Sequence, residues 1–210
     1  MGKEDMKIIV VERDKLFGED YFQGFKNHEE FDYEKIILDN LKIMRRGDAE
    51  VDSSHKQPIG YMLIVNPKSK KIFVYLRSGE GGENRLHGKW SLGVGGHIEP
   101  FDIKNKNINP IRKSQLRELK EEIEIIGNIL GIKVLGYVND EEDSVGKVHF
   151  GILYLVEVDG DVKPRDSEIE RGSLMSFEEL KNILNDENFI VETWSEIAIK
   201  PLKKYFDSLE

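Results

Sequence analysis

Three glutamates stand close together in one stretch of this chain, with a spacing that suits metal binding. Glu118, Glu121 and Glu122 lie at positions i, i+3 and i+4, so on a helix their side chains share one face. Like charges at that spacing cost roughly 0.2–0.5 kcal/mol per pair, and a bound cation would remove the conflict. Carboxylate oxygens are the ligands that Mg²⁺ and Mn²⁺ prefer. The ordinary alternative is the exposed face of an amphipathic helix, with Arg117 and Lys120 as further surface charges.

A glycine-rich segment upstream favours the metal site. The chain reads WSLGVGGHIEP from Trp90 to Pro100, and RELKEE from Arg117 to Glu122. Together these segments resemble the Nudix box of MutT-like proteins, G-x5-E-x7-R-E-U-x-E-E-x-G-U with U apolar. The residues that match it are Gly95, Gly96, Ile98, Glu99, Arg117, Glu118, Leu119, Glu121, Glu122 and Ile125. Two halves in the right order are a stronger indication than either half alone.

The box is longer than the pattern. Between Gly96 and Arg117 lie 20 residues, so the chain carries about seven more than the pattern allows. The middle glutamate is replaced by Asp102, counted from Gly96, or by Asn109, counted back from Arg117. We place the insertion at residues 103–109, because Asn109 and Pro110 indicate a fresh helix start. A longer loop there costs little closure entropy.

The resemblance implies an α+β fold, a Nudix-like α/β/α sandwich with a central mixed sheet, and a Mg²⁺-dependent hydrolase, with Mn²⁺ as a substitute. The expected substrate is a nucleoside diphosphate linked to another moiety, cut at its phosphate anhydride. The metal ligands implied are Gly95, through its carbonyl, and Glu118, Glu121 and Glu122. The expected catalytic residues are Glu118, Glu121, Arg117 and Glu168, with Glu168 as ligand or general base. Its rivals are Glu170, Glu141, Glu142 and Asp143.

Two other functions are alternatives for a sequence of this kind. Isopentenyl diphosphate isomerase resembles Nudix proteins but relies on a cysteine in its common form, and this chain has none. A nucleotide-binding sensor without hydrolysis stays open, because such modules often lose box residues.

Composition limits the partners. The net charge of -9 argues against strong nucleic-acid binding, which relies on clustered Lys and Arg. No apolar run approaches the roughly 20 residues that cross a bilayer. We therefore expect a cytoplasmic protein whose small phosphorylated substrate is a nucleotide derivative, and we leave a homodimer open. Residues 1–55 are interpreted as an N-terminal elaboration, for dimerisation, gating or partner binding, and residues 56–210 as the Nudix domain.

The apolar pattern predicts the elements that position these residues. Strands are expected at 6–11, 60–65, 71–76, 132–138 and 148–158, and helices at 33–44, 110–127, 176–184 and 192–206. Residues 66–70 predict a hairpin turn, and residues 45–58 a loop. In the box helix, Leu116, Leu119, Ile123 and Ile126 form the expected apolar stripe.

Several side chains other than the three glutamates have candidate roles. Basic residues near the box that are candidates for phosphate binding are Arg77, Arg85, Lys104, Lys106 and Arg112, although a surface role is the ordinary alternative. His97 is a candidate for phosphate or metal-bound water and equally for loop packing. Trp90 is expected in the core. The other histidines, His28, His55, His87 and His149, show no metal-ligand spacing.

Overall fold

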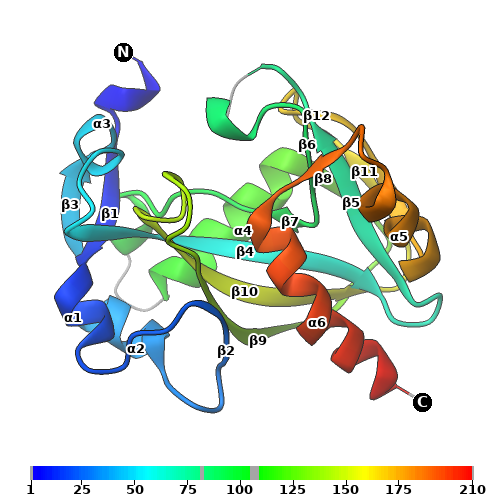
Figure 1. Ribbon diagram of the computed structural model, residues 1–210, viewed down its shortest axis with the longest axis horizontal. Coiled ribbons are helices and arrows are strands. Elements are labelled where there is room, and N and C mark those ends of the chain that lie inside the picture. Colours follow the sequence, from blue (N-terminus) through cyan, green and yellow to red (C-terminus); the bar gives the residue numbers. More distant parts are fainter. Residues whose placement is uncertain (1, 81–82, 105–108, 210) are drawn as a thin grey trace. The chain divides into compact units, whose positions relative to one another are not determined.

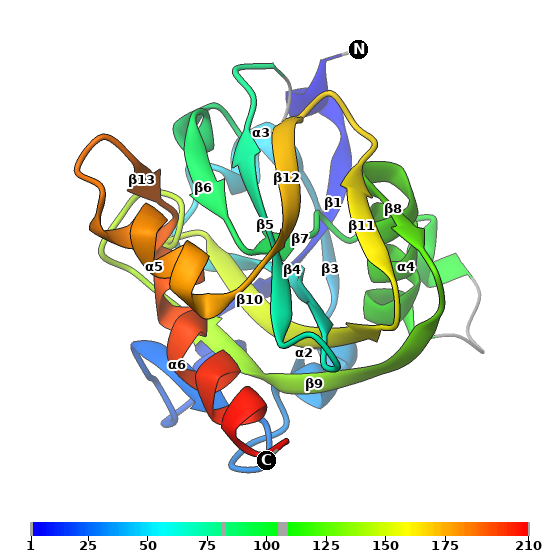
Figure 2. The ribbon, with the colours of Figure 1, turned by 90° about the vertical axis from the view of Figure 1, so that its right-hand side faces the viewer.

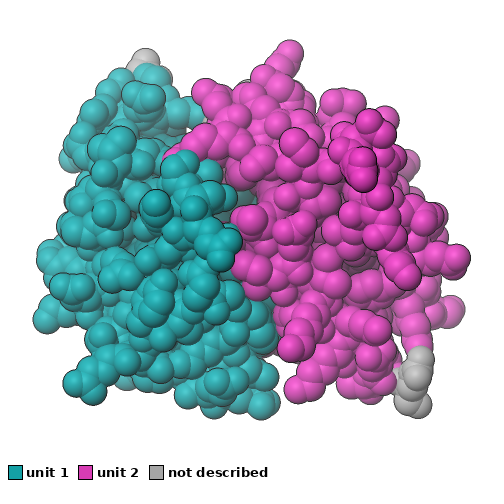
Figure 3. All heavy atoms as spheres, viewed as in Figure 1, with its two compact units in different colours: residues 1–61, 95–116, 135–153 teal, residues 62–94, 117–134, 154–210 magenta. Residues whose placement is uncertain are grey.

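The computed structural model describes residues 2–80, 83–104 and 109–209 (Figure 1). The chain divides into two compact units, coloured separately in Figure 3. Unit 1 consists of residues 1–61, 95–116 and 135–153, and unit 2 of residues 62–94, 117–134 and 154–210. Four elements contribute residues to both units: β4 (His55–Asn66), α4 (Pro110–Glu122), β9 (Ile129–Asn139) and β10 (His149–Val158).

The strands of unit 1 pair antiparallel. β1 (Lys7–Glu12) pairs with β3 (Lys42–Arg45) and with the start of β4, and β2 (Gly24–Asn27) pairs with the end of β9. The remaining elements of this unit are short: α1 (Arg13–Phe17), α2 (Tyr33–Asp39), α3 (Arg46–Ala49) and the 3-10 turns Lys3–Asp5 and Asp102–Lys104.

Aromatic rings fill the interior of unit 1 around Tyr33, which is fully buried. Its ring centroid lies 5.0 Å from that of Tyr137 and 5.2 Å from that of Phe150, and Phe17 packs edge-on to Phe150. Such pairs add about 0.5–1.5 kcal/mol beyond the area they bury. The Tyr33 hydroxyl donates to the backbone oxygen of Asp20 at 2.6 Å, so its polar end is satisfied inside the core.

Unit 2 is organised around β5 (Lys71–Arg77). Figure 2 shows β12 (Ile169–Met175), β5 and β6 (Lys89–Ser91) side by side, and both β12 and β6 pair antiparallel with β5. The shorter pairs are β7 (Gly93–Val94) with β4, β11 (Asp161–Pro164) with β8 (Ile123–Ile126), and β13 (Ile190–Val191), which runs parallel to β6. The helices are α5 (Phe177–Asn185), which contacts β5 and β12, and α6 (Thr193–Asp207), with a 3-10 turn at Asn84–Leu86.

Most predicted elements are confirmed, and the fold is α+β with mixed sheet pairing. β4 and β5 form the expected hairpin, with Val65 opposite Ile72. Asn109 begins α4, because its side-chain oxygen accepts from the backbone N–H of Ile111 at 2.9 Å. Ser176 begins α5 with a capping box to Glu179. Among the described residues, no helix is long and apolar enough to cross a membrane.

The prediction that the box helix continues to Gly127 was wrong. α4 ends at Glu122, and residues 123–126 form β8, which pairs with β11. Three isoleucines among four residues favour a strand there. The predicted apolar stripe is therefore only half buried: Leu119 and Ile123 are in the core, whereas Leu116 and Ile126 are exposed.

The N-terminal predictions were wrong at two places. The helix expected over 33–44 ends at Asp39, since residues 42–45 form β3 and pair with β1. The loop expected over 45–58 contains α3 and the start of β4. Pairing with β1 overrides the local pattern at β3 and at the start of β4. The predicted insertion loop, 103–109, lies partly outside the described residues, at 105–108.

Glu141 provides a test of packing in unit 1. It accepts from the Nη2 of Arg13 at 2.9 Å and lies 2.9 Å from the Nζ of Lys56, whose side chain is fully buried. Burial acts to raise the pKa of Glu141, but the hydrogen bonds and charges of Arg13 and Lys56 lower it from 4.5 to about 2. Because the folded pKa is the lower one, this stabilisation is present above about pH 4.5 and is lost as the pH falls toward 2.

Glu141→Gln should therefore lower the free energy of unfolding at neutral pH by about 3 kcal/mol, because the Lys56 charge loses its buried partner. The difference in unfolding free energy between this variant and wild type should shrink as the pH falls from about 4.5 toward 2. Urea denaturation at a series of pH values measures both effects. Glu142→Gln, at the exposed neighbouring position, is the matched control. Equal effects of the two substitutions would show that the contacts of Glu141 with Arg13 and Lys56 do not stabilise the fold.

Candidate active site

The last turns of α4 carry the box carboxylates together with an arginine. The Nη1 of Arg117 lies 2.5 Å from a carboxylate oxygen of Glu118 and 3.4 Å from one of Glu121. The side chain of Glu118 is 15% exposed, whereas that of Glu121 is 57% exposed. Arg117 therefore fixes the orientation of Glu118 and leaves Glu121 accessible to solvent.

The loop between β11 and β12 closes the end of α4. The backbone oxygen of Glu122 accepts from the backbone N–H groups of Arg165 at 2.8 Å and Asp166 at 3.2 Å. The Arg165 guanidinium also donates to the backbone oxygen of Lys120 at 3.1 Å. These bonds satisfy carbonyl groups that a helix end otherwise leaves without intrahelical partners. They also fix the loop that carries Glu168 beside the end of the helix.

Glu168 is held from a second direction, since its backbone oxygen accepts from the N–H of Ser78 at 2.9 Å. Its own N–H donates to the carboxylate of Asp166 at 2.7 Å. The structure thus brings Glu168 together with the carboxylates of α4, from a position 46 residues further along the chain than Glu122. Its rival Glu170 is exposed on β12.

The position of Glu122 beside these carboxylates changes its pKa. Burial is the largest cause that raises its pKa, and the negative charges of Glu118, Glu168 and Asp166 also raise it. Together, against the opposing charge of Arg77, they bring the pKa from 4.5 to about 8. A carboxyl group in this setting is neutral over much of the physiological pH range unless another cation joins the group. The cluster therefore favours a positively charged ligand.

Arg77 of β5 lies near the cluster, but its ion-pair partner is another residue. It forms an ion pair with Glu192, which is almost fully buried and also accepts from the hydroxyl of Ser91 at 2.8 Å. Burial acts to lower the pKa of Arg77, and Glu192, Tyr75 and Glu122 raise it well above its usual value. Arg77 is therefore a largely buried counter-charge of Glu192, and its expected contact with phosphate stays a prediction.

The opening half of the box lies in unit 1. A Cβ on Gly95 would lie 1.8 Å from the backbone oxygen of Gly60, so only glycine lets the chain pass β4 at this point. Asp102 is fully buried and accepts from the N–H of Glu99 at 3.0 Å, which closes a turn. The two residues at the place of the middle glutamate, Asp102 and Asn109, thus stabilise a turn and a helix start.

Several of the remaining candidates have structural partners. Glu141 is paired with Arg13 and Lys56, as described above, and the carboxylate of Asp143 accepts from the N–H of Gly146 at 2.7 Å. Arg85 forms a bidentate pair with Glu83. Trp90 is buried against Phe189, as predicted. Lys106 lies outside the described residues.

Sequence reasoning missed Asp166, Glu192 and the cluster of Glu50 with two histidines. Asp166 had a local signal, since it stands two residues before Glu168. Glu192 is the first residue of a predicted helix, and nothing in the sequence indicated its pairing with Arg77.

Comparison with known proteins identifies the family of this carboxylate helix. Residues 56–193 match the model of the NUDIX domain. The chain belongs to the NUDIX family. As a member it is a hydrolase of phosphorus-containing acid anhydrides, as the box resemblance implied.

Two of the similar proteins match nearly the whole chain. The NUDIX chain is 37% identical to protein YmaB of Bacillus subtilis (strain 168), over 97% of its own length and 100% of that protein. The structure of Tm1382, named as a candidate Nudix hydrolase, has a TM-score of 0.77 at 24% identity, covering 95% of this chain and 99% of Tm1382. The NUDIX domain of Shewanella oneidensis NrtR, complexed with ADP ribose, has a TM-score of 0.54 at 12% identity, covering 71% and 88%. These two likenesses show the Nudix fold.

The buried ion pair behind the carboxylates gives a prediction for stability. Glu192→Gln should lower the free energy of unfolding by about 3 kcal/mol, because it leaves the buried Arg77 without its main counter-charge. Urea denaturation at neutral pH measures the change. Glu196→Gln, exposed in the first turn of the same helix, is the matched control and should change stability by only a few tenths of a kcal/mol. A loss no larger than that of the control would show that the pair does not stabilise the fold.

Proposed function

We propose that the chain hydrolyses a phosphate anhydride bond in a nucleoside diphosphate linked to another moiety, with Mg²⁺ as cofactor and Mn²⁺ as a substitute. The observation that carries the proposal is the gathering of Glu118, Glu122 and Glu168 in one place, with the pKa of Glu122 raised to about 8. The substrate class is supported by the ADP ribose bound to the NUDIX domain of NrtR. The cytoplasm remains our expected compartment.

The residues present fit a hard divalent cation. All the side chains that we assign to it, Glu118, Glu121 and Glu122, offer carboxylate oxygens, and magnesium sites typically combine a few of these with waters and substrate phosphates. A cation there would offset the repulsion that raises the pKa of Glu122. Gly95 remains a ligand predicted from the sequence alone. When bound, the metal supplies positive charge for the diphosphate and makes a water molecule more acidic.

The chain's own groups account for the rest of the reaction. We assign Glu168 as the general base, which takes the proton of the attacking water through its carboxylate. The water oxygen then bonds to phosphorus as the phosphorus–oxygen bond of the leaving phosphate breaks. Arg117 is a positioning residue, because its hydrogen bonds hold Glu118 and Glu121. The bond from Ser78 and the bonds that close α4 keep Glu168 in register with the helix.

Glu121→Gln tests this assignment with little risk to the fold, since the side chain is mostly exposed. A panel of nucleoside diphosphate derivatives, assayed with Mg²⁺ and with Mn²⁺, should show turnover by wild type. The substitution should lower kcat/KM by about 100-fold or more, as expected for loss of a metal ligand. Glu124→Gln, at an exposed position just beyond the helix, should retain full activity.

The same assay separates the proposal from its alternatives. Full activity of Glu121→Gln would show that the site is wrongly assigned. Tight binding of one compound, with no turnover of any compound in either metal, would identify a sensor that binds a nucleotide without hydrolysis.

A further inference from the structure

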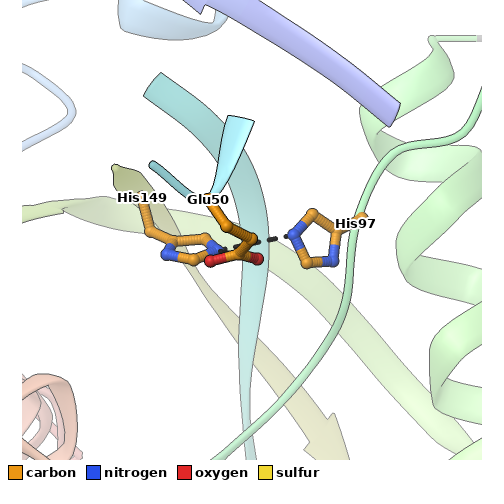
Figure 4. A group of neighbouring side chains, drawn as sticks. All are labelled: Glu50, His97 and His149. Carbon is orange, nitrogen blue, oxygen red and sulfur yellow. Dashed lines mark hydrogen bonds and ion pairs between the residues drawn. The ribbon is translucent and has the colours of Figure 1, made fainter. Parts of the chain in front are cut away.

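A second group of metal-binding side chains lies entirely within unit 1. Glu50, His97 and His149 point toward one another in Figure 4, and one ligand atom from each lies within 4.8 Å of the others. The Nε2 atoms of the two histidines are 3.4 Å apart, and the Nε2 of His149 is 3.8 Å from a carboxylate oxygen of Glu50. His149 is 5% exposed. None of these residues belongs to the carboxylate cluster described above.

Backbone bonds hold the three residues in place. Glu50 directly follows α3, His149 begins β10, and His97 forms an isolated bridge with Ile59 of β4. The backbone oxygen of His97 also accepts from the hydroxyl of Ser114 at 3.1 Å. The group is therefore anchored on three elements and does not depend on the side chains alone.

The hydrogen bonds of His149 prepare it for metal binding. Its Nδ1 lies 2.7 Å from the backbone oxygen of Val145, and a carbonyl oxygen can only accept, so Nδ1 carries the proton. In the neutral ring, Nε2 then holds the lone pair, and Nε2 is the atom that faces His97 and Glu50. A histidine that binds a metal through one ring nitrogen typically donates the N–H of its other ring nitrogen to a carbonyl oxygen in this way.

The spacing also suits a small ion. With zinc–nitrogen bonds of roughly 2.0–2.1 Å in a tetrahedral site, two ligand nitrogens stand about 3.3 Å apart, close to the 3.4 Å between these Nε2 atoms. Two imidazoles and one carboxylate form a ligand set typical of zinc and related transition metals. It differs from the oxygen-only set that Mg²⁺ prefers.

The competing explanation is a polar cluster held by hydrogen bonds alone. The Nε2 of His97 lies 2.7 Å from the side-chain oxygen of Gln57, and Glu50 lies 3.5 Å from the Nε of Arg46. Metal binding would exchange the bond to Gln57 for a bond to the ion. We propose that Glu50, His97 and His149 bind one divalent transition-metal ion, represented by Zn²⁺, and leave one coordination position for water or another ligand.

Zinc binding to the full-length protein tests the site. Metal-free protein in millimolar Mg²⁺, which occupies sites made of oxygen ligands, is titrated with Zn²⁺ against a chromogenic chelator. Wild type should bind one Zn²⁺ per chain. His149→Gln and Glu50→Gln should each weaken that binding by at least about 100-fold, while thermal unfolding without zinc shows that the variants are folded. His28→Gln, at an exposed position, and Glu121→Gln should bind Zn²⁺ as wild type does.

Co²⁺ provides a readout that does not depend on any variant. Co²⁺ bound to wild type should show the intense visible bands of four- or five-coordinate cobalt, and excess Zn²⁺ should remove them. Weak bands of six-coordinate cobalt would overturn the proposal. Equal Zn²⁺ affinity in wild type, His149→Gln and Glu50→Gln would also overturn it, and a loss confined to Glu121→Gln would assign the zinc to the carboxylate cluster instead.

Discussion

Four carboxylates gather where α4 ends, and their mutual repulsion is the constraint on which the arrangement of unit 2 depends. Glu118, Glu168 and Asp166 together act to raise the pKa of Glu122, which burial already raises. Backbone hydrogen bonds hold the group together against this repulsion: Arg165 and Asp166 cap the end of α4, and Ser78 fixes Glu168. These bonds use main-chain atoms, so they do not engage the carboxylate oxygens of the cluster.

The positive charge of Arg77 reduces the repulsion among the carboxylates of the cluster without neutralising them. An arginine with no other partner would neutralise part of the charge of these carboxylates in place of a metal ion. Arg77 already forms an ion pair with Glu192. The net result is a negative group with a fixed positive charge behind it, suited to an exchangeable divalent cation. The insertion in the box is compatible with this arrangement, because Asn109 starts α4 afresh whatever precedes it.

The sequence alone predicts those helices and strands for which local signals agree with the tertiary pairing. The hairpin of β4 and β5, the start of α4 at Asn109 and the helix that begins near Ser176 all have short-range signals, and all were predicted. The end of α4 was mispredicted because its position is set by β11 and by Arg165, both far along the chain. Glu50, His97 and His149 come from three distant segments with no local spacing, so only the fold could bring them together. Glu168 was chosen among several acids from the family resemblance alone, and its role stays a prediction.

The dependence of stability on Mg²⁺ tests the central claim most directly. Urea denaturation of wild type should show a free energy of unfolding that rises with Mg²⁺ concentration as RT ln(1 + [Mg²⁺]/Kd), since binding to the folded state alone stabilises it. NaCl at equal ionic strength should not reproduce the rise, and Glu118→Gln should largely abolish it. If wild type shows no specific effect of Mg²⁺, or if Glu118→Gln shows the same effect as wild type, the carboxylates at the end of α4 are not the metal site.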